Sequence, residues 1–477
     1  MPYLAPRQLA VHLGGWREPS AGAAYLALAD RIRLLVLDGR VAIGTRLPAE
    51  RELAAELGVS RTTVTGAYAR LRDLGYLDSR RGSGSLARLP VSGAPGGAGE
   101  PEPLEGIADF SRATLPTWPG VADAAVRAAE RLPAYLGESG FDAVGYLGLR
   151  EAIAAQYGSR GLPTDPDQIV VTLGAQHAIA LVARTVLGRG DRALVENPTY
   201  PHALDALRAA GGRLVSVGVS TEDGWDPAGF AAAFSSAAPA LAYLMPDSHN
   251  PTGRSMPASQ RDRVAALAAR AGTVLVVDET MRGLDLTGGA GHPPFATLGP
   301  HVVTIGSVGK SVWGGLRIGW IRGSREFAQR VVRARFANDL GTPMLEQLIV
   351  AELMPDLERI LAARRAVLRE NRDHVVTQLR RRMPEWHVPL PDGGLTVWVN
   401  LGRPLSSALA LRAREGGLLI ASGQRFGQGG AFERFLRVPF SLRRAELDAG
   451  LDALEQAWAA VLRRPSAGAD ESYAQIA

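Results

Sequence analysis

VVTIGSVGKSVWGGLRIGW, residues 302–320, joins a short apolar run to a glycine-rich segment that contains Lys310. Lys310 is the only lysine among 477 residues, and arginine supplies the other strongly basic side chains. Arginine does not deprotonate in proteins, so it cannot replace lysine as an amine nucleophile. Lys310 is therefore a candidate covalent amine. The alternative is accidental retention of one lysine in a chain biased toward arginine.

Around this segment, from about residue 107 onward, short apolar runs alternate with alanine-rich helical patterns. The runs are IVVTL, ALVE, RLVSV, LAYLM, TVLVVDE and HVVTIGS. Continuous apolar strands that alternate with helices are typical of an α/β fold with a mostly parallel sheet covered on both faces. Ligands of such sheets bind at the carboxyl ends of the strands. The part that begins at HVPLPDGG is expected to form a smaller α+β subdomain.

The first 90 residues have a different pattern. Apolar residues at helical spacing predict a helix over 25–38 and a short one in AERELAAELG, residues 49–58, that Gly58 ends. Ser60 suits the N-cap of a third helix that has an apolar stripe and a polar, basic face. A glycine-rich hairpin pattern follows. Gly66, inside that third helix, either permits close approach to DNA or is merely tolerated.

Composition excludes several classes of protein. An apolar share of 46% with 21% charged residues rules out wholesale disorder. The absence of cysteine rules out disulfide scaffolds, thiol nucleophiles and cysteine-ligated metals, and we expect no metal site. No apolar run is long enough for a membrane span, and the N-terminus lacks a signal-peptide pattern. We therefore expect a cytoplasmic protein with no membrane partner.

These patterns predict four segments. Residues 23–90 form a helix-turn-helix module, and residues 91–107 (VSGAPGGAGEPEPLEGI) form a flexible linker. Residues 108–464 form the α/β region, and residues 465–477 form a loose tail.

The N-terminal module resembles the winged helix-turn-helix domain of the GntR family of bacterial transcription regulators. The resemblance rests on LPAERELAAELGVSRTTVTGAYARLRDLGYL, residues 47–77, and on the wing SRRGSGS, residues 79–85. Between residues 25 and 90 there are 11 arginines against 7 acidic residues, which fits a DNA face. A solvated face on a protein-binding module is the alternative. The resemblance implies DNA contacts by Arg51, Arg61, Thr62, Thr63, Arg81 and Gly82.

The α/β region carries a second set of motifs: LGAQ (173–176), ENPTY (196–200), HNPTG (249–253), VVDE (276–279), SVGK (307–310) and LRIG (316–319). A pyridine aldehyde phosphate would need an amine for its aldehyde and a carboxylate for its ring nitrogen. It would also need a donor for its ring oxygen and a helix N-terminus with Ser and Arg for its phosphate. In this order the motifs resemble fold-type I pyridoxal-phosphate proteins of the aspartate aminotransferase superfamily, from about residue 110 to 462.

This second resemblance implies roles for individual residues. Lys310 would bind pyridoxal 5'-phosphate as an aldimine, Asp278 would pair with the ring nitrogen, and Asn250 would donate to the ring oxygen. Tyr200 would stack on the ring or serve only in packing. Arg437 would grip a carboxylate or make a surface ion pair, and Asp278 could instead be a helix cap. The phosphate would be held by Ala175, Gln176, Ser307 and Arg317.

One position departs from the family pattern. Related proteins place a Tyr two or three residues after the ring-nitrogen Asp, where it donates to the ring oxygen. Thr280 and Met281 stand at those positions here. Thr280 could donate if it reaches the ring oxygen, whereas Met281 cannot. Efficient transamination is therefore in doubt.

Together the two halves resemble the MocR subfamily of GntR regulators. This implies a homodimeric, pyridoxal-phosphate-dependent transcription regulator that binds a DNA operator. Its effector would be a small amine, an amino acid or the cofactor itself, bound at Lys310. The alternatives are an active aminotransferase carrying a DNA-binding domain, and a cofactor-free binding module in which Lys310 is idle.

Overall fold

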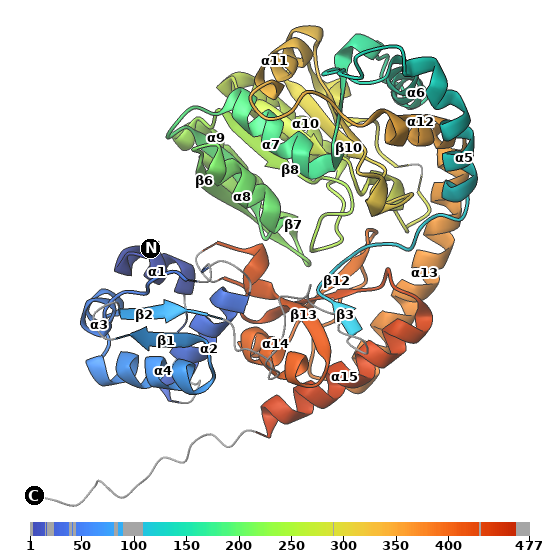
Figure 1. Ribbon diagram of the computed structural model, residues 1–477. Helices are drawn as coiled ribbons and strands as arrows, with labels where there is room; N and C mark the ends of the chain where they lie inside the picture. Colours follow the sequence, from blue (N-terminus) through green and yellow to red (C-terminus); the bar gives the residue numbers. More distant parts are fainter. Residues whose placement is uncertain are drawn as a thin grey trace, which may run out of the picture.

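The computed structural model describes residues 3–14, 16, 23–37, 41, 44–80, 84–88, 108–289, 291–428 and 431–463. Figure 1 shows an N-terminal module in blue beside a small domain in orange and red, with a large sheet domain in green and yellow beyond the small domain. A long helix, α13 (Leu357–Arg382), runs along the large and small domains.

The N-terminal module is a helix-turn-helix with a two-stranded wing. The backbone of Gly58 is in the left-handed conformation and ends the second predicted helix. At the start of the third predicted helix, the Ser60 hydroxyl accepts a hydrogen bond from the Thr63 amide. Leu9 and Leu13, which lie before residue 23, are buried in the same core as the other helices. The elements are α1 (Pro6–Leu13), α2 (Ala24–Leu37), α3 (Glu50–Leu57), α4 (Arg61–Asp73), β1 (Leu77–Arg80) and β2 (Gly84–Ala87).

The large domain is built on an eight-stranded sheet in the order β4-β11-β10-β9-β8-β5-β6-β7. Neighbours from β10 to β6 run parallel, whereas β11 is antiparallel to β4 and β10, and β7 to β6. The strands are β4 (Ile169–Thr172), β5 (Arg192–Asn197), β6 (Arg213–Ser220), β7 (Gly224–Trp225), β8 (Leu241–Leu244), β9 (Val274–Asp278), β10 (Val302–Ser307) and β11 (Gly319–Arg322).

Successive residues of these strands point to two separate apolar cores. Leu275 and Val277 of β9 belong to one core, and Val276 belongs to the other. This alternation explains the continuous apolar runs in the sequence, because both faces of the sheet are covered by helices. The covering helices are α5 (Val121–Arg131), α6 (Leu147–Gly158), α7 (Gly174–Val186), α8 (Pro201–Ala209), α9 (Pro227–Ala237), α10 (Ala258–Ala271), α11 (Arg325–Arg335) and α12 (Met344–Leu353).

The small domain has a four-stranded sheet in the order β12-β14-β13-β3. The sequence predicts this domain from the C-terminal part alone, but β3 (Ala108–Phe110) comes from the start of the α/β region and pairs parallel with β13. The chain thus enters the small domain before it builds the large one. The other elements are β12 (Thr396–Asn400), α14 (Ser406–Glu415), β13 (Leu418–Ser422), β14 (Phe435–Pro439) and α15 (Arg444–Leu462).

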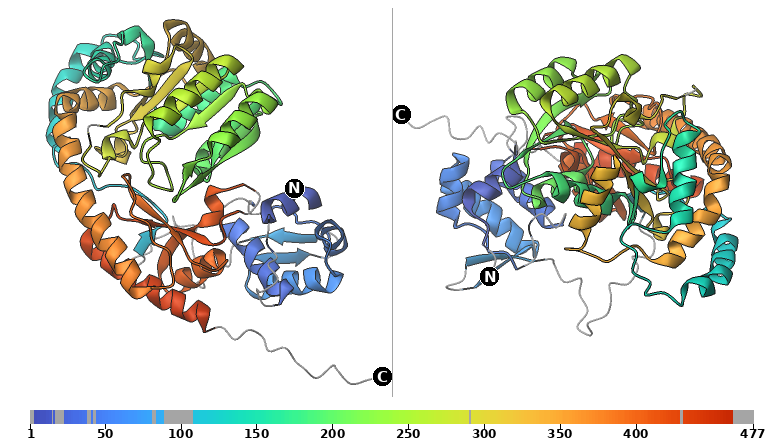
Figure 2. Two further views of the ribbon diagram at one scale, coloured as in Figure 1. Left: turned by 180° about the vertical axis from the view of Figure 1, so that it is seen from behind. Right: turned by 90° about the horizontal axis from the view of Figure 1, so that it is seen from above.

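Helix α2 of the N-terminal module packs against α14 of the small domain, and Figure 2 shows the two regions side by side. Leu34 is buried against Ala410 and Leu411. At the same contact, the Arg31 guanidinium donates to the Leu13 carbonyl at 3.0 Å and to the Ser407 hydroxyl at 3.4 Å. The module therefore has a specific apolar and polar contact with the domain that carries β14.

The α/β fold class predicted from the sequence is confirmed, with its N-terminal helix-turn-helix and its mostly parallel sheet. The predicted linker (91–107) and tail (465–477), and the wing residues Arg81 and Gly82, lie outside the described residues. In the described part of the chain, no helix is both long and apolar enough to cross a membrane.

Gly450 in α15 offers a test of this packing. A Cβ there would lie 2.2 Å from the Phe110 ring, which is fully buried on β3. A Gly to Ala change inside a helix normally stabilises by about 1 kcal/mol. We expect Gly450→Ala to lower the free energy of unfolding by about 1–3 kcal/mol instead, because the core is overpacked. Urea unfolding followed by circular dichroism measures this.

The matched control is Gly158→Ala in α6, where a Cβ meets nothing within 4 Å. This control should be neutral or stabilising. Equal effects of the two substitutions would contradict the packing of α15 on β3.

Candidate functional site

The carboxyl ends of β8, β9 and β10 meet at one edge of the large sheet. Asp278 is the last residue of β9, and Lys310 follows the end of β10 by three residues. The parallel register places Asp278 beside Ile305 of β10. The charges of Asp278, Arg317 and Arg437 all act on the Lys310 amine. Four of the residues that the sequence predicts to act together therefore lie near this edge: Asp278, Lys310, Arg317 and Arg437.

The Lys310 amine is partly buried. Its Nζ donates to the Ala113 carbonyl at 2.6 Å. Burial, together with the Arg437 and Arg317 charges, lowers the pKa of Lys310 to about 8, against an opposing effect of Asp278. A large fraction of the amine is therefore neutral, and so nucleophilic, near pH 8.

Asp278 is buried and held by two donors. The Tyr243 hydroxyl donates to its Oδ2 at 2.7 Å, and the Thr280 amide donates to its Oδ1 at 2.9 Å. Burial raises the pKa of Asp278, while these hydrogen bonds lower it. Its carboxylate is thus fixed in orientation and has a high affinity for a proton or for a protonated partner.

Arg317, Gly174 and Ser307 come together beside the N-terminus of α7. Arg317 Nη2 donates to the Leu173 carbonyl at 3.1 Å, and a Cβ on Gly174 would lie only 2.9 Å from that nitrogen. The Ser307 hydroxyl donates to the Ile318 carbonyl at 2.9 Å and accepts from the Gly309 amide. Ala175 and Gln176 lie in the first turn of α7. A helix N-terminus beside an arginine and a serine is a favourable place for a phosphate.

Asn250 and Tyr200 differ in the contacts that their side chains make. The Asn250 side-chain oxygen is buried and has no hydrogen-bond partner among the described residues. Tyr200 is partly buried with its ring edge-to-face on His202 at 5.3 Å, and burial, with the Asp278 charge, raises the pKa of Tyr200 to about 12. The Asn250 amide thus retains unused hydrogen-bonding capacity at the predicted site.

Arg437 is buried on β14, so it is not a surface residue making an exposed ion pair. Its Nη2 donates to the Ser111 carbonyl, and its guanidinium lies over the Phe426 ring at 4.8 Å. Burial lowers the pKa of Arg437 to about 10. Its Nε has no hydrogen-bond partner among the described residues, which leaves a donor for an anion.

Met281 and Thr280 differ in their surroundings. Met281 is buried in the apolar core of the small domain, while Thr280 is partly buried and its backbone supports Asp278. Contact of Thr280 with a ring oxygen stays a prediction.

Sequence analysis missed Tyr243, Ser111 and Ala113. Tyr243 lies in the run LAYLM and resembles an ordinary core residue, although a hydroxyl in an otherwise apolar strand is a weak signal. Ser111 and Ala113 make their contacts through backbone carbonyls, which every residue has, so the residue types do not indicate these contacts.

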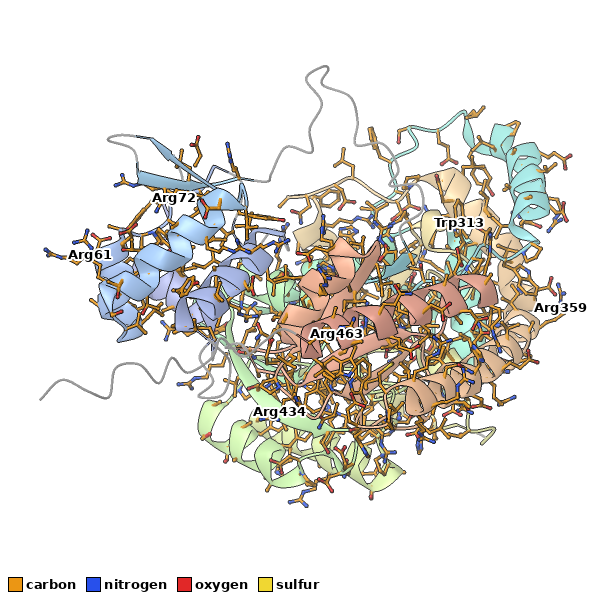
Figure 3. All side chains as sticks on the ribbon, turned by 90° about the horizontal axis from the view of Figure 1, so that it is seen from below. Arg61, Arg72, Trp313, Arg359, Arg434 and Arg463 are labelled. Carbon is orange, nitrogen blue, oxygen red and sulfur yellow. The ribbon has the colours of Figure 1, made fainter. Side chains whose placement is uncertain are left out.

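The predicted DNA-contacting residues of α3 and α4 lie on the outside of the N-terminal module. Arg51, Arg61 and Thr62 are exposed, and Figure 3 shows Arg61 extending away from the body of the protein. Thr63 is partly buried and its hydroxyl lies 2.8 Å from that of Ser60. Gly66 faces α2 rather than DNA, because a Cβ there would lie 3.2 Å from the Tyr25 ring.

Comparison with known proteins supports both halves. The family model for aminotransferase class I and II matches residues 121–454, and that for bacterial regulatory proteins of the gntR family matches residues 24–86. A 2-aminoadipate transaminase of Thermus thermophilus is 33% identical over 62% of this chain and 75% of its own length. The HTH-type transcriptional regulator TauR of Rhodobacter capsulatus is 29% identical over 87% of this chain and 93% of its own.

Among solved structures, LysN, an alpha-aminoadipate aminotransferase of Thermus thermophilus, has a TM-score of 0.69 and 31% identity. The likeness covers 75% of this chain and 94% of LysN, which was crystallised with N-(5'-phosphopyridoxyl)-L-leucine.

The lowered pKa of Lys310 predicts the pH dependence of its reactivity. We expect acylation of Lys310 by an N-hydroxysuccinimide ester to be half-maximal near pH 8 instead of the ordinary value of 10.5. Peptide mass spectrometry identifies this single lysine without ambiguity. Between these two values the unfolded chain binds more protons than the folded one, so the free energy of unfolding should rise with pH. A midpoint at the ordinary lysine value would contradict a buried amine.

Proposed function

The chain belongs to the aminotransferase class I and II family and carries a domain of the gntR family of bacterial regulatory proteins, and from this premise we propose that it is a pyridoxal-phosphate-dependent transcription regulator. The proposed effector is a small amine, an amino acid or pyridoxal 5'-phosphate itself. Its proposed partners are a DNA operator and a second copy of the chain, and its proposed location is the cytoplasm.

One observation carries this proposal. The sole lysine of the chain is partly buried and feels the charge of the buried Asp278 carboxylate at the carboxyl edge of the sheet, in the same chain as a helix-turn-helix. A neutral amine near pH 8 is the group that an aldehyde cofactor requires. A cofactor-free binding module would give no reason to bury an ionisable amine, which costs free energy.

The residues at this edge fit pyridoxal 5'-phosphate. When bound, this group supplies an aldehyde that couples to amines and a ring that withdraws electrons. Asp278 would face the ring nitrogen and Lys310 the aldehyde, and the Asn250 side-chain nitrogen would donate to the ring oxygen. Tyr200 would lie on the ring. Arg317, Ser307 and the first amides of α7, at Ala175 and Gln176, would hold the phosphate.

Arg437 is the proposed carboxylate-binding residue for the effector. Two observations support this role: its Nε has no partner among the described residues, and its charge acts on Lys310. Because Arg437 stays partly desolvated, an anion that pairs with it would gain more than at an exposed arginine.

A chain of contacts joins β14 to the DNA-binding module. Glu433, just before β14, accepts hydrogen bonds from the Ser407 amide at 2.8 Å and the Ser407 hydroxyl at 2.7 Å. Ser407 in turn meets Arg31 of α2. A shift of β14 when Arg437 binds an effector would therefore reach the module. This route supports sensing rather than catalysis alone.

The alternative is an active aminotransferase with a DNA-binding domain. The 33% identity to a transaminase favours it. The absence of a Tyr hydroxyl at Thr280 and Met281 argues against efficient proton transfer.

The first prediction concerns covalent binding. Borohydride treatment of protein saturated with pyridoxal 5'-phosphate should leave the reduced adduct on the peptide that contains Lys310. Lys310→Arg keeps the charge but cannot react, so it should show no adduct. An unmodified Lys310 peptide in the saturated protein would refute cofactor binding at this site.

A second prediction concerns turnover. We expect amino acids to change the absorption spectrum of the loaded protein with little release of keto acid. Steady-state assays with a panel of amino acids and keto acids measure this. Turnover at an ordinary enzyme rate, about 10 per second, would favour the aminotransferase alternative.

The third prediction concerns DNA. Arg61→Ala should weaken binding to the DNA upstream of the protein's own gene by about 1–3 kcal/mol, as expected for loss of one bidentate base contact. Fluorescence anisotropy at fixed salt measures the affinity. The control is Arg359→Ala, an exposed arginine on α13 far from the module (Figure 3), which should bind normally. If both variants bind like the unmodified protein, α4 does not enter the groove.

A further inference from the structure

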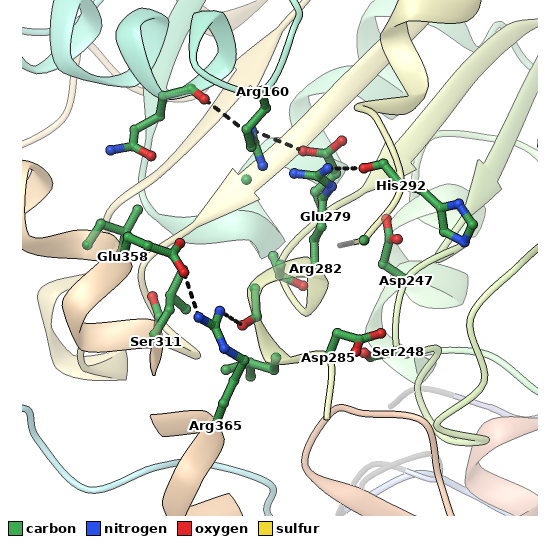
Figure 4. A pocket seen from close by; sticks show the side chains of 18 of the residues that line it. Arg160, Asp247, Ser248, Glu279, Arg282, Asp285, His292, Ser311, Glu358 and Arg365 are labelled. Atoms are coloured by element: carbon green, nitrogen blue, oxygen red, sulfur yellow. Dashed lines mark hydrogen bonds and ion pairs between the residues drawn. The ribbon is translucent and has the colours of Figure 1, made fainter. Parts of the chain in front are cut away.

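A cavity of about 730 Å³ lies between the C-terminal end of α6, the start of α13 and the loop after β9 (Figure 4). Its described lining residues do not include Lys310, Asp278 or Arg437. The alternation along β9 explains this separation. Asp278 points to the face that carries Tyr243, whereas Glu279, the next residue, points to the opposite face and lines the cavity. Cavities of this size accommodate small molecules.

Glu279 is the unexplained group in this cavity. Only 4% of its side chain is exposed, and its Oε1 has no hydrogen-bond partner among the described residues. The nearest cation, on Arg160, lies 3.6 Å away, longer than a hydrogen bond. Burial raises the pKa of Glu279, as expected for a carboxylate without sufficient donors. A positively charged donor is the group that would satisfy it.

Arg282 supplies the opposite charge. One of its terminal nitrogens donates to the His292 carbonyl, while its Nε is buried and has no partner among the described residues. Figure 4 shows Glu279 and Arg282 side by side at the cavity. A buried carboxylate and a buried guanidinium thus each retain an unused hydrogen-bonding position.

The lining as a whole favours a ligand with no net charge. Its described residues include four arginines and four carboxylates, with Arg282 and Glu279 among them, so neither a simple anion nor a simple cation is favoured. Tyr157 and Trp320 add aromatic surface to the wall. A zwitterion matches this combination of separated charges and overall neutrality.

We propose that this cavity is a second effector site that binds a small zwitterionic amino acid, with its ammonium group at Glu279 and its carboxylate at Arg282. This site goes beyond the proposed function, which places the effector at Lys310. The two sites adjoin, because Thr280 and Ser307 line the cavity while the Thr280 amide holds Asp278 and Ser307 lies three residues before Lys310. An occupant of the cavity would therefore act on the Lys310 site through Thr280 and Ser307, which the two sites share, and not through Lys310 itself.

The test uses full-length Lys310→Ala protein purified without pyridoxal 5'-phosphate, so that no covalent capture can occur. The probes are the standard α-amino acids, titrated by calorimetry. We expect at least one to bind, and its deaminated acid and decarboxylated amine to bind about tenfold or more weakly, since each loses one charged contact. Adding Glu279→Gln should weaken binding by a similar factor.

The matched control is Glu358→Gln, the same chemical change at a lining residue whose side chain is 75% exposed and pairs with Arg365. It should bind like the parent. If Glu279→Gln does not fold, Gly289→Phe replaces it: a Cβ at this exposed lining glycine meets only Thr287 Oγ1, at 3.6 Å, and a large ring there should block the cavity.

Two results would overturn the proposal. One is that no amino acid binds the Lys310→Ala protein, even if the unmodified, cofactor-loaded protein responds to amino acids. The other is equal binding in the parent, the Glu279→Gln protein and the Gly289→Phe protein. The proposed function fails separately, through the absence of an adduct on Lys310 in the borohydride experiment.

Discussion

Asp278, which is buried, and Lys310, which is partly buried, lie at one edge of the large sheet, and the surrounding contacts are arranged around that constraint. The carboxylate is held by Tyr243 and by the Thr280 amide, and the amine is held by the Ala113 carbonyl. Among the described residues neither group has a direct ion pair; burial shifts the pKa of each toward its neutral form. Burial of two ionisable groups costs free energy of folding. A ligand that is both an aldehyde and a base would explain this cost, because it would react with the amine and pair with the carboxylate.

The small domain completes this edge. It contributes Arg437 on β14 and, through the segment after β3, the carbonyls of Ser111 and Ala113. The site thus lies where the two domains meet, and any relative movement of the domains changes the contacts of Lys310. Because α2 of the DNA-binding module packs on α14 of the small domain, the module is attached to the domain that contributes Arg437 to the site. The arrangement suits a protein in which ligand binding changes the position of a DNA-binding surface.

The two faces of the large sheet are used differently. On one face, Tyr243 and Asp278 support the proposed cofactor site. On the other, Glu279 ends in a neutral, charge-lined cavity. Adjacent residues of one strand therefore serve two different sites. The carboxylates also differ in their partners: Asp278 has two donors, whereas Glu279 has an oxygen without one in the described part of the chain. Asp278 is therefore fixed by the protein itself, whereas Glu279 keeps an acceptor for which the described residues provide no donor.

The sequence by itself determined the α/β class and the helix-turn-helix, and it singled out Lys310 as the only lysine. Hydrophobic periodicity, caps such as Ser60 and Gly58, and a single lysine are local signals that do not depend on distant contacts. The tertiary structure alone decided that β3 joins the small sheet, that Tyr243 holds Asp278, that Gly66 faces Tyr25 instead of DNA, and that Glu279 faces a cavity. Each of these depends on which segments, far apart in the chain, pack together. Backbone carbonyls such as that of Ala113 have no side-chain identity, so no sequence pattern could reveal their role.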